Sequence, residues 1–175
     1  MLTFNKILGN ADSNAERKIL LAGKVEDMIN TVIRQIAFYD FECKLHEARS
    51  IGELTPSQIN EIWMSVQVES LGPCFNFMEG YETFWAYVPH FIHSPFYVYA
   101  YAFGDGLVNA LYSVYEEGLP KFDLKYFEML KAGGSKHHSE LLKPFGLDAS
   151  DPKFWNKGLS VISKMIDELE MMEES

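Results

Sequence analysis

The stretch from Ser13 to about Arg49 is the feature that most constrains how this chain folds. It contains no proline and a single glycine, Gly23. This pattern predicts one long amphipathic helix, because apolar residues recur along it at helical spacing. These residues are Ile29, Ile33, Ile36, Ala37, Phe41 and Leu45.

A second helix is predicted to follow, because its start carries a full set of capping residues. In Thr55-Pro56-Ser57-Gln58, threonine stands at the N-cap, proline at the first helical position and glutamine at the third. Threonine and glutamine in this arrangement satisfy the free amide groups of the first turn reciprocally. We expect this helix to end near Ser70.

The next segment, residues 71–94, combines glycine and proline with many aromatic residues and has no sustained period. We expect an ordered loop region there, with short extended or helical pieces. Ser94-Pro95 then predicts the start of another helix, which runs to about Glu117 and stops at Gly118-Leu-Pro120.

Three shorter helices are predicted in the last third of the chain. The first spans about residues 123–132, the second about 138–144, and the third begins at Asp151-Pro152 and fades into an acidic tail. No strand pattern competes with these helices. We therefore expect an all-α fold, a single irregular multi-helix domain that spans residues 1–175 and has long loops.

Composition and charge exclude several classes of protein. A formal charge of -10 without a basic stripe argues against nucleic acid as a partner. No run of about 18 apolar residues marks a membrane span, and the N-terminus has too short an apolar stretch for a signal peptide. Cys43 and Cys74 have neither metal-site nor disulfide-framework spacing. We therefore expect a cytoplasmic protein with reduced thiols and no membrane association.

Polar-tipped rings concentrate between Tyr87 and Gly104. On a helix from Pro95, Tyr97 and Tyr101 would share one face, and Tyr99 would point to the other side. Phenol and imidazole are hydrogen-bond donors at neutral pH, which suits stabilisation of a developing oxyanion. The alternative, favoured by composition alone, is that the tyrosines are core residues with satisfied hydroxyls. The candidate catalytic residues are His90, His93, Tyr97, Tyr99 and Tyr101.

Histidines occur at several other places where a metal site must be considered. His46-Glu47 would begin a His-Glu-x-x-His zinc motif, but Ser50 stands where the second histidine is needed. Glu42 and His46, four residues apart, are therefore interpreted as a solvated helix pair. A metal site built from His90, His93, His137 or His138 is a weaker alternative, since paired histidines without a third ligand carry little weight. We expect no metal ligands in this chain.

Gly133-Gly134-Ser135 follows a predicted helix and has two interpretations. Its backbone amides could form a nest for an anion or a substrate carboxylate. By itself, a glycine at this position more commonly caps the helix. The three residues are kept as candidate substrate-binding residues.

Five motifs change the weight of these alternatives, because they occur in the order and with the gaps of a known family. They are Phe38-Tyr-Asp-Phe41-Glu-Cys-Lys-Leu-His46-Glu47, Gly52-Glu-Leu-Thr-Pro56, the segment from Pro89 to Gly104, Leu130-Lys-Ala-Gly-Gly-Ser135 and Pro144-Phe-Gly-Leu-Asp148. Together they resemble the C-terminal region of oligoendopeptidase F, a thimet-oligopeptidase-like zinc metallopeptidase, over about residues 1–170.

The resemblance implies a helical peptidase fold that acts on short peptides. In that family, His-Glu-x-x-His and a glutamate on the following helix hold zinc, and both precede the segment that Met1 to Phe4 resembles. It therefore implies that this chain holds no cofactor and is inactive alone. It also implies that His90 or His93, with Tyr97 and either Tyr99 or Tyr101, contacts the scissile carbonyl of an oligopeptide substrate.

Two functions from different classes follow. The first is the substrate-binding part of such a peptidase, and the alternative is a non-enzymatic helical binding or assembly module derived from the same fold. In both cases we expect apolar side chains near the N-terminus to be covered by a partner. That partner is either a second copy in a homodimer or a missing N-terminal half. The candidate contact residues are Leu2, Phe4, Ile7 and Leu8.

Overall fold

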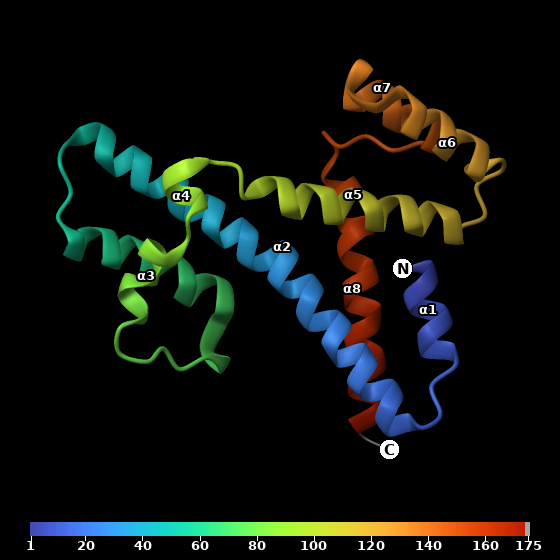
Figure 1. Cartoon of the computed structure of the whole chain (residues 1–175), viewed down its shortest axis with the longest axis horizontal. Coiled ribbons are helices and arrows are strands. Elements are labelled where there is room, and N and C mark those ends of the chain that lie inside the picture. The colour runs from blue at the N-terminus through green and yellow to red at the C-terminus, as the bar shows by residue number, and fades with distance from the viewer. Residues whose placement is uncertain (174–175) are drawn as a thin grey trace. The chain divides into compact units, whose positions relative to one another are not determined.

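The computed structural model describes residues 1–173, which form helices joined by loops (Figure 1). No strand occurs among these residues, so the predicted all-α class is confirmed. The described chain divides into two compact units. Unit 1 comprises residues 1–28 and 104–175, and unit 2 comprises residues 29–103.

The two predicted N-terminal helices are both present. α2 spans Asn14–Ile51 and α3 spans Pro56–Leu71. The capping box at the start of α3 forms as predicted: the Thr55 hydroxyl accepts from the Gln58 amide, and the Gln58 side chain accepts from the Thr55 amide at 2.9 Å. Because the free amides are satisfied locally, α3 begins at the residue where the sequence places it.

Unit 2 has an aromatic core. Phe38 and Phe41 of α2 lie against Trp63 of α3, with ring centroids 5.6 and 5.2 Å apart. Phe91 joins them from α4, which spans His90–His93, and its ring lies 5.1 Å from that of Phe41. The indole of Trp63 is fully buried and donates its N–H to the carbonyl of Tyr81 at 3.0 Å. This packing fixes α4, and with it His90, against α2.

The segment between α3 and α4 contains short helical turns, as expected. They are η1 (Gly72–Cys74) and η2 (Tyr81–Tyr87). The Trp85 indole donates to the side chain of Asn60 on α3 at 2.7 Å, and the Tyr81 hydroxyl donates to that of Gln67 at 3.1 Å. These bonds hold the loop onto α3.

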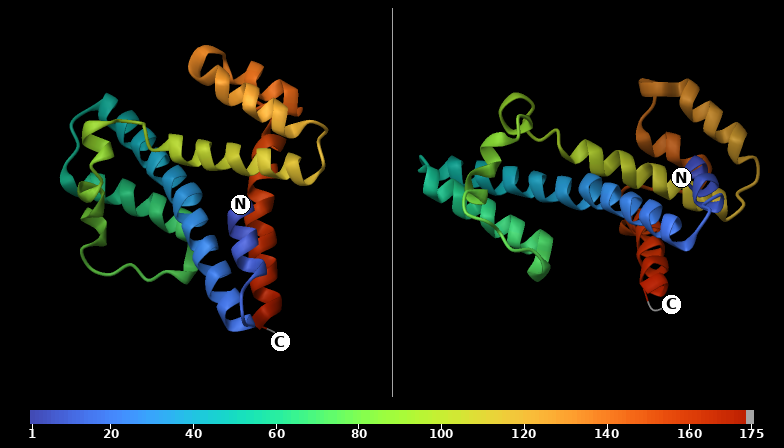
Figure 2. Two further views of the ribbon diagram at one scale, coloured as in Figure 1. Left: turned by 45° about the vertical axis from the view of Figure 1, so that its right-hand side comes forward. Right: turned by 60° about the horizontal axis from the view of Figure 1, so that its bottom comes forward.

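Unit 1 has a more aliphatic core. Its elements are α1 (Leu2–Gly9), the start of α2, most of α5 (Tyr99–Glu116), α6 (Phe122–Ala132), η3 (Gly133–Ser135), α7 (His138–Leu142), η4 (Lys143–Phe145) and α8 (Pro152–Glu173). The buried residues Ala110, Leu111 and Val114 of α5 belong to one cluster with Leu142 and Phe145. Figure 2 shows α1 beside α8, and α5 crossing α8.

The crossing of α5 and α8 depends on two glycines. A Cβ added to Gly158 would lie 2.9 Å from the carbonyl oxygen of Gly106, a distance that real Cβ atoms essentially never show. The two backbones therefore approach more closely than any side chain permits. Near the other end of α8, Arg17 of α2 forms an ion pair with Glu168 and also donates to the carbonyl of Leu8 at 3.1 Å.

One helix start was predicted wrongly. The helix expected from Pro95 begins at Tyr99, and residues 95–98 form a turn instead. Phe96 has φ +61°, a left-handed conformation that no helix continues through. The reason is a tertiary contact: the Phe96 amide donates to the carboxylate of Glu42 at 2.8 Å. No helix among residues 1–173 is long and apolar enough to cross a membrane.

Candidate functional site

Three of the predicted catalytic residues form one cluster in unit 2, which we call the His90 cluster: His90, Tyr97 and Tyr101. The His90 Nε2 atom lies 3.1 Å from the Tyr101 hydroxyl. The rings of His90 and Tyr97 are parallel, with centroids 6.3 Å apart, and Tyr101 is perpendicular to both at 5.8 Å. The structure therefore brings one of the two candidate histidines within hydrogen-bond reach of a tyrosine hydroxyl.

The tyrosines of this segment are on the surface. Tyr97 is 53% exposed, Tyr99 53% and Tyr101 42%. The alternative that they are buried core residues is therefore wrong. Hydroxyls that sit at the surface on packed rings are free to meet a ligand from solvent, whereas core hydroxyls would not be.

Tyr99 and His93 lie apart from the cluster. Tyr99 packs edge-on against Tyr39 of α2, with centroids 6.0 Å apart, so it points to the other side as expected. His93 ends α4 and is exposed. Among the described residues, no hydrogen bond or ring contact joins His93 to Tyr97 or Tyr101. Of the two histidines left open by the sequence, the structure brings His90 to the phenols.

Glu42 lies beneath this segment, and its interpretation from the sequence was wrong. It was expected to be solvated in a pair with His46, but its exposed fraction is 0%. Its Oε1 accepts from the Phe96 amide, whereas Oε2 has no hydrogen-bond partner among the described residues. The sequence held a signal, because Phe38, Phe41, Glu42 and Leu45 share the apolar face of the helix.

Burial and hydrogen bonding act on the Glu42 carboxyl in opposite directions. Burial raises the pKa of Glu42, because a low-dielectric surrounding disfavours the charged form. The hydrogen bond from the Phe96 amide and the nearby imidazoles of His46 and His90 favour the anion and offset part of this rise in pKa. The His46 ring also packs on the Phe96 ring, with centroids 4.8 Å apart.

The candidate substrate-binding residues Gly133, Gly134 and Ser135 belong to unit 1 and form η3. Gly133 has φ +51°, and its amide donates to the carbonyl of Leu130, so it caps α6. The Ser135 hydroxyl donates to the carbonyl of Ala132 at 2.6 Å. Since two of these donors are engaged within the turn, the capping interpretation accounts for Gly133. The substrate-binding role stays a prediction.

The histidines considered as alternative metal ligands lie in both units. His137 and His138 lie in unit 1 with ring centroids 4.0 Å apart, and His137 Nδ1 lies 2.9 Å from the Ser139 hydroxyl. His90 and His93 lie in unit 2. Within residues 1–173, no group of three His, Cys, Asp or Glu side chains could hold a metal ion. The residues described do not fit a zinc site.

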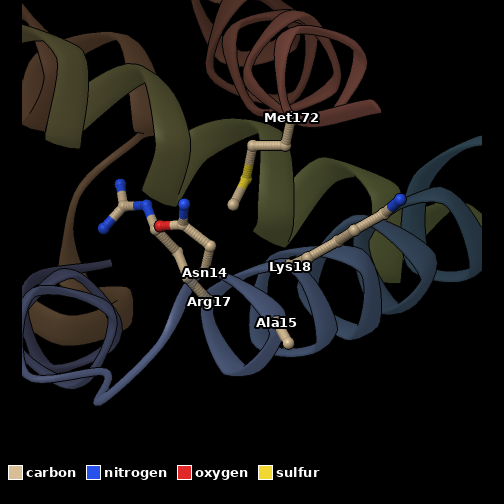
Figure 3. Close-up of a pocket in the computed structure, with 5 residues that line it drawn as sticks. All are labelled: Asn14, Ala15, Arg17, Lys18 and Met172. Atoms are coloured by element: carbon tan, nitrogen blue, oxygen red, sulfur yellow. The ribbon is translucent and has the colours of Figure 1, made fainter. Parts of the chain in front are cut away.

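Unit 1 contains pockets that are separate from the His90 cluster. One of about 350 Å³ lies between the start of α2 and the end of α8 (Figure 3). Its lining includes Asn14 and Arg17, and Met172 points into it from α8. The Arg17 guanidinium is already paired with Glu168. None of the predicted site residues lines this pocket.

A second pocket in unit 1 is more apolar than the first. It measures about 450 Å³ and is lined by residues of α1, α5 and α6, including Leu2, Val108 and Phe127, all more than half exposed. Of the residues expected to contact a partner, Leu2 and Ile7 are exposed, Phe4 is half-buried and Leu8 is buried in the chain's own core. Leu2 and Ile7 are therefore exposed to solvent and available to a partner.

Comparison with known proteins places these residues in a family context. The model of peptidase family M3 matches residues 2–161. Oligopeptidase PepF of Bacillus subtilis is 30% identical over 166 residues, 94% of this chain and 24% of that protein. An oligoendopeptidase F homolog of Lactococcus lactis is 31% identical over 171 residues, 96% of this chain and 28% of that protein. The chain spans about a quarter of the length of these relatives.

Solved structures show the same fold. A provisionally assigned peptidase from Chlamydophila abortus matches 98% of this chain with a TM-score of 0.87 and 30% identity, over 29% of its own chain. Oligoendopeptidase-F from Enterococcus faecium also matches 98% of this chain with a TM-score of 0.87, at 23% identity and over 33% of its own chain. The resemblance predicted from the five motifs is confirmed.

Proposed function

The chain belongs to peptidase family M3, and from this premise we propose that it is the substrate-binding part of an oligoendopeptidase F-like peptidase. In this proposal it binds short peptides at the His90 cluster and does not hydrolyse them alone. The observation that carries the proposal is the 3.1 Å contact between Nε2 of the half-buried His90 and the hydroxyl of the exposed Tyr101.

The tautomer of His90 decides which hydrogen of the cluster faces a ligand. When His90 Nε2 carries the proton and donates to the Tyr101 oxygen, the phenol hydrogen remains free to donate outward. A peptide carbonyl oxygen could accept it, and the bond would strengthen as negative charge develops on that oxygen. Tyr97 presents a second exposed phenol beside the same imidazole. The cluster thus supplies donors for a carbonyl.

Zinc chemistry is not assigned to these residues. Peptidase family M3 is zinc-dependent in general, but the described residues offer no set of three ligands. We propose that the metal belongs to a part of the peptidase other than residues 1–173. No step through the metal is derived for this chain.

The proposal is tested by peptide affinity, with a blocked heptapeptide, acetyl-Ala-Ala-Phe-Gly-Leu-Ala-Ala-amide, as the probe in calorimetry. Tyr101→Phe removes one donor and should weaken binding by about 2- to 12-fold, the value of one ordinary hydrogen bond. Tyr87→Phe, at an exposed tyrosine of unit 2 outside the cluster, should leave the affinity unchanged.

Two results would contradict the proposal. One is equal affinity in wild type and Tyr101→Phe, since the cluster would then not be the binding site. The other is cleavage of the heptapeptide by the purified chain in the presence of equimolar zinc chloride. We expect intact peptide after prolonged incubation, as measured by mass spectrometry.

The alternative proposal is a non-enzymatic binding or assembly module, and the apolar pocket at Leu2, Val108 and Phe127 supports it. In either case we propose that a second copy or the zinc-bearing half of the peptidase covers Leu2 and Ile7. Light scattering at micromolar concentration checks the first option, with a dimer expected. Leu2→Lys should return the chain to a monomer.

The free thiols of Cys43 and Cys74 support our further proposal of a cytoplasmic location.

A further inference from the structure

The buried carboxylate of Glu42 has a role that neither the core nor the proposed chemistry explains. It comes from α2, is fully buried, and has one oxygen without a hydrogen-bond partner among the described residues. A buried carboxylate is costly to desolvate, so a purely structural position would favour an apolar residue of the same size. The reason for a carboxylate at this position is therefore to be found in the group that its Oε1 atom contacts.

Oε1 of Glu42 contacts the backbone amide of Phe96, three residues before α5 begins at Tyr99. The Phe96 amide donates to it at 2.8 Å. Phe96 has φ +61°, which is unfavourable for a residue with a side chain and persists only where the surroundings hold it. The hydrogen bond supplies that hold.

Ring packing fixes the same residue from outside. The Phe96 ring lies 4.8 Å from that of His46 and 6.0 Å from that of Tyr39, both on α2. Backbone and side chain of Phe96 are thus both bound to one helix. Tyr97 follows directly, and Tyr101 lies in the first turn of α5.

We propose that Glu42 is the positioning residue of the His90 cluster: its buried carboxylate fixes the left-handed turn at Phe96 and thereby places Tyr97 and Tyr101 beside His90. The assignment rests on the proposed function only where it concerns peptide affinity. The carboxylate acts as a hydrogen-bond acceptor here, since Oε2 has no partner and Glu42 forms no ion pair among the described residues.

The acceptor role separates Glu42 variants from one another. Glu42→Gln keeps an oxygen at the same reach and loses the charge, so it should preserve the turn. Glu42→Leu keeps the volume and loses the acceptor, and Glu42→Asp keeps the acceptor but shortens its reach by one methylene. Glu47→Leu is the matched control, because Glu47 is exposed on the same helix.

Amide hydrogen exchange at Phe96 and the nuclear Overhauser contact between His90 and Tyr101 report the turn directly. In Glu42→Leu and Glu42→Asp we expect Phe96 exchange to accelerate by about 10-fold, the effect of losing one hydrogen bond, and the His90–Tyr101 contact to disappear. Glu42→Gln and Glu47→Leu should match wild type. If Glu42→Leu does not fold, the Asp and Gln variants decide by themselves.

Peptide affinity provides the second measurement. The heptapeptide should bind Glu42→Asp about 10-fold more weakly and Glu42→Gln within about 3-fold of wild type. If wild type binds no peptide, the proposed function fails, and the exchange and Overhauser data still decide the role of Glu42. Unchanged Phe96 exchange in Glu42→Asp and Glu42→Leu would overturn the inference. So would loss of the turn in Glu42→Gln, because that variant keeps the acceptor.

Discussion

Units 1 and 2 bury different kinds of side chain, and the difference concerns the part of the chain that carries the candidate site. The core of unit 2 is built from Phe38, Phe41 and Trp63 and also encloses the polar side chains of Glu42 and Gln67. The core cluster of unit 1 is largely aliphatic, and its α5–α8 crossing is formed by backbone at Gly106 and Gly158. Buried polar groups are costly unless they are hydrogen-bonded. Unit 1 also buries a polar side chain, Asn109 of α5, but it donates to Asp105 at 2.7 Å. Among the described residues, the buried side-chain polar atoms without a hydrogen-bond partner, Glu42 Oε2 and Gln67 Nε2, belong to unit 2.

The strongest way to break this comparison is to remove the centre of the aromatic core. Trp63→Ala should reduce the free energy of unfolding by about 3–5 kcal/mol, because the cavity cannot close among rigid rings. Phe154→Ala, in the unit 1 core, should cost a similar amount. Native-state hydrogen exchange should accelerate mainly in residues 29–103 for the first variant and mainly outside them for the second. An equal rise everywhere in both variants would remove the distinction.

A smaller effect sharpens the account of unit 1. Gly158→Ala should cost about 1–3 kcal/mol of unfolding free energy in urea titration, because its methyl group would strike the Gly106 backbone, which cannot rotate away. Gly23→Ala is the control, since a Cβ there meets nothing within 4 Å. In a helix, that change should stabilise by about 0.5–1 kcal/mol. A neutral Gly158→Ala would show that the crossing is not closely packed in solution.

The smallest expected effect compares, through pH, the buried carboxyl of Glu42 in unit 2 with the half-buried carboxyl of Asp105 in unit 1. Burial raises the pKa of Glu42 above 4.5 and that of Asp105 in unit 1 above 3.8. The folded state then holds the proton more tightly than the unfolded state, so each group lowers stability as pH rises from its ordinary pKa through the raised one. Glu42→Gln should abolish the part of this stability loss that comes from Glu42, and Asp105→Asn should abolish the part that comes from Asp105.

Urea titrations of wild type and both variants, from pH 4 to pH 8, measure this decline. The difference between wild type and Glu42→Gln isolates Glu42, because the other carboxyls are common to both proteins. A difference that grows in the opposite direction, with wild type gaining stability as pH rises, would mean that the Phe96 and histidine contacts outweigh burial.

Local patterns predicted much of the helical framework, because their causes lie within a few residues. The Thr55–Gln58 capping box and the Pro-free run of α2 are such cases. The start of α5 was missed because its cause, the bond from Phe96 to Glu42, joins residues 54 positions apart. The sequence predicted a cluster of histidine and tyrosine in this segment, and its role as a site stays a prediction. Which histidine meets Tyr101 depends on how Phe91 anchors α4 to Phe41, which one sequence does not display.

The central claim is that the His90 cluster is a peptide-binding surface. Chemical-shift mapping of the ¹⁵N-labelled chain with the blocked heptapeptide tests it most directly. We predict saturable shifts centred on His90, Tyr97 and Tyr101, absent or displaced to higher peptide concentration in Tyr101→Phe. Absence of saturable shifts at millimolar peptide, or shifts confined to residues lining the unit 1 pockets, would contradict the account.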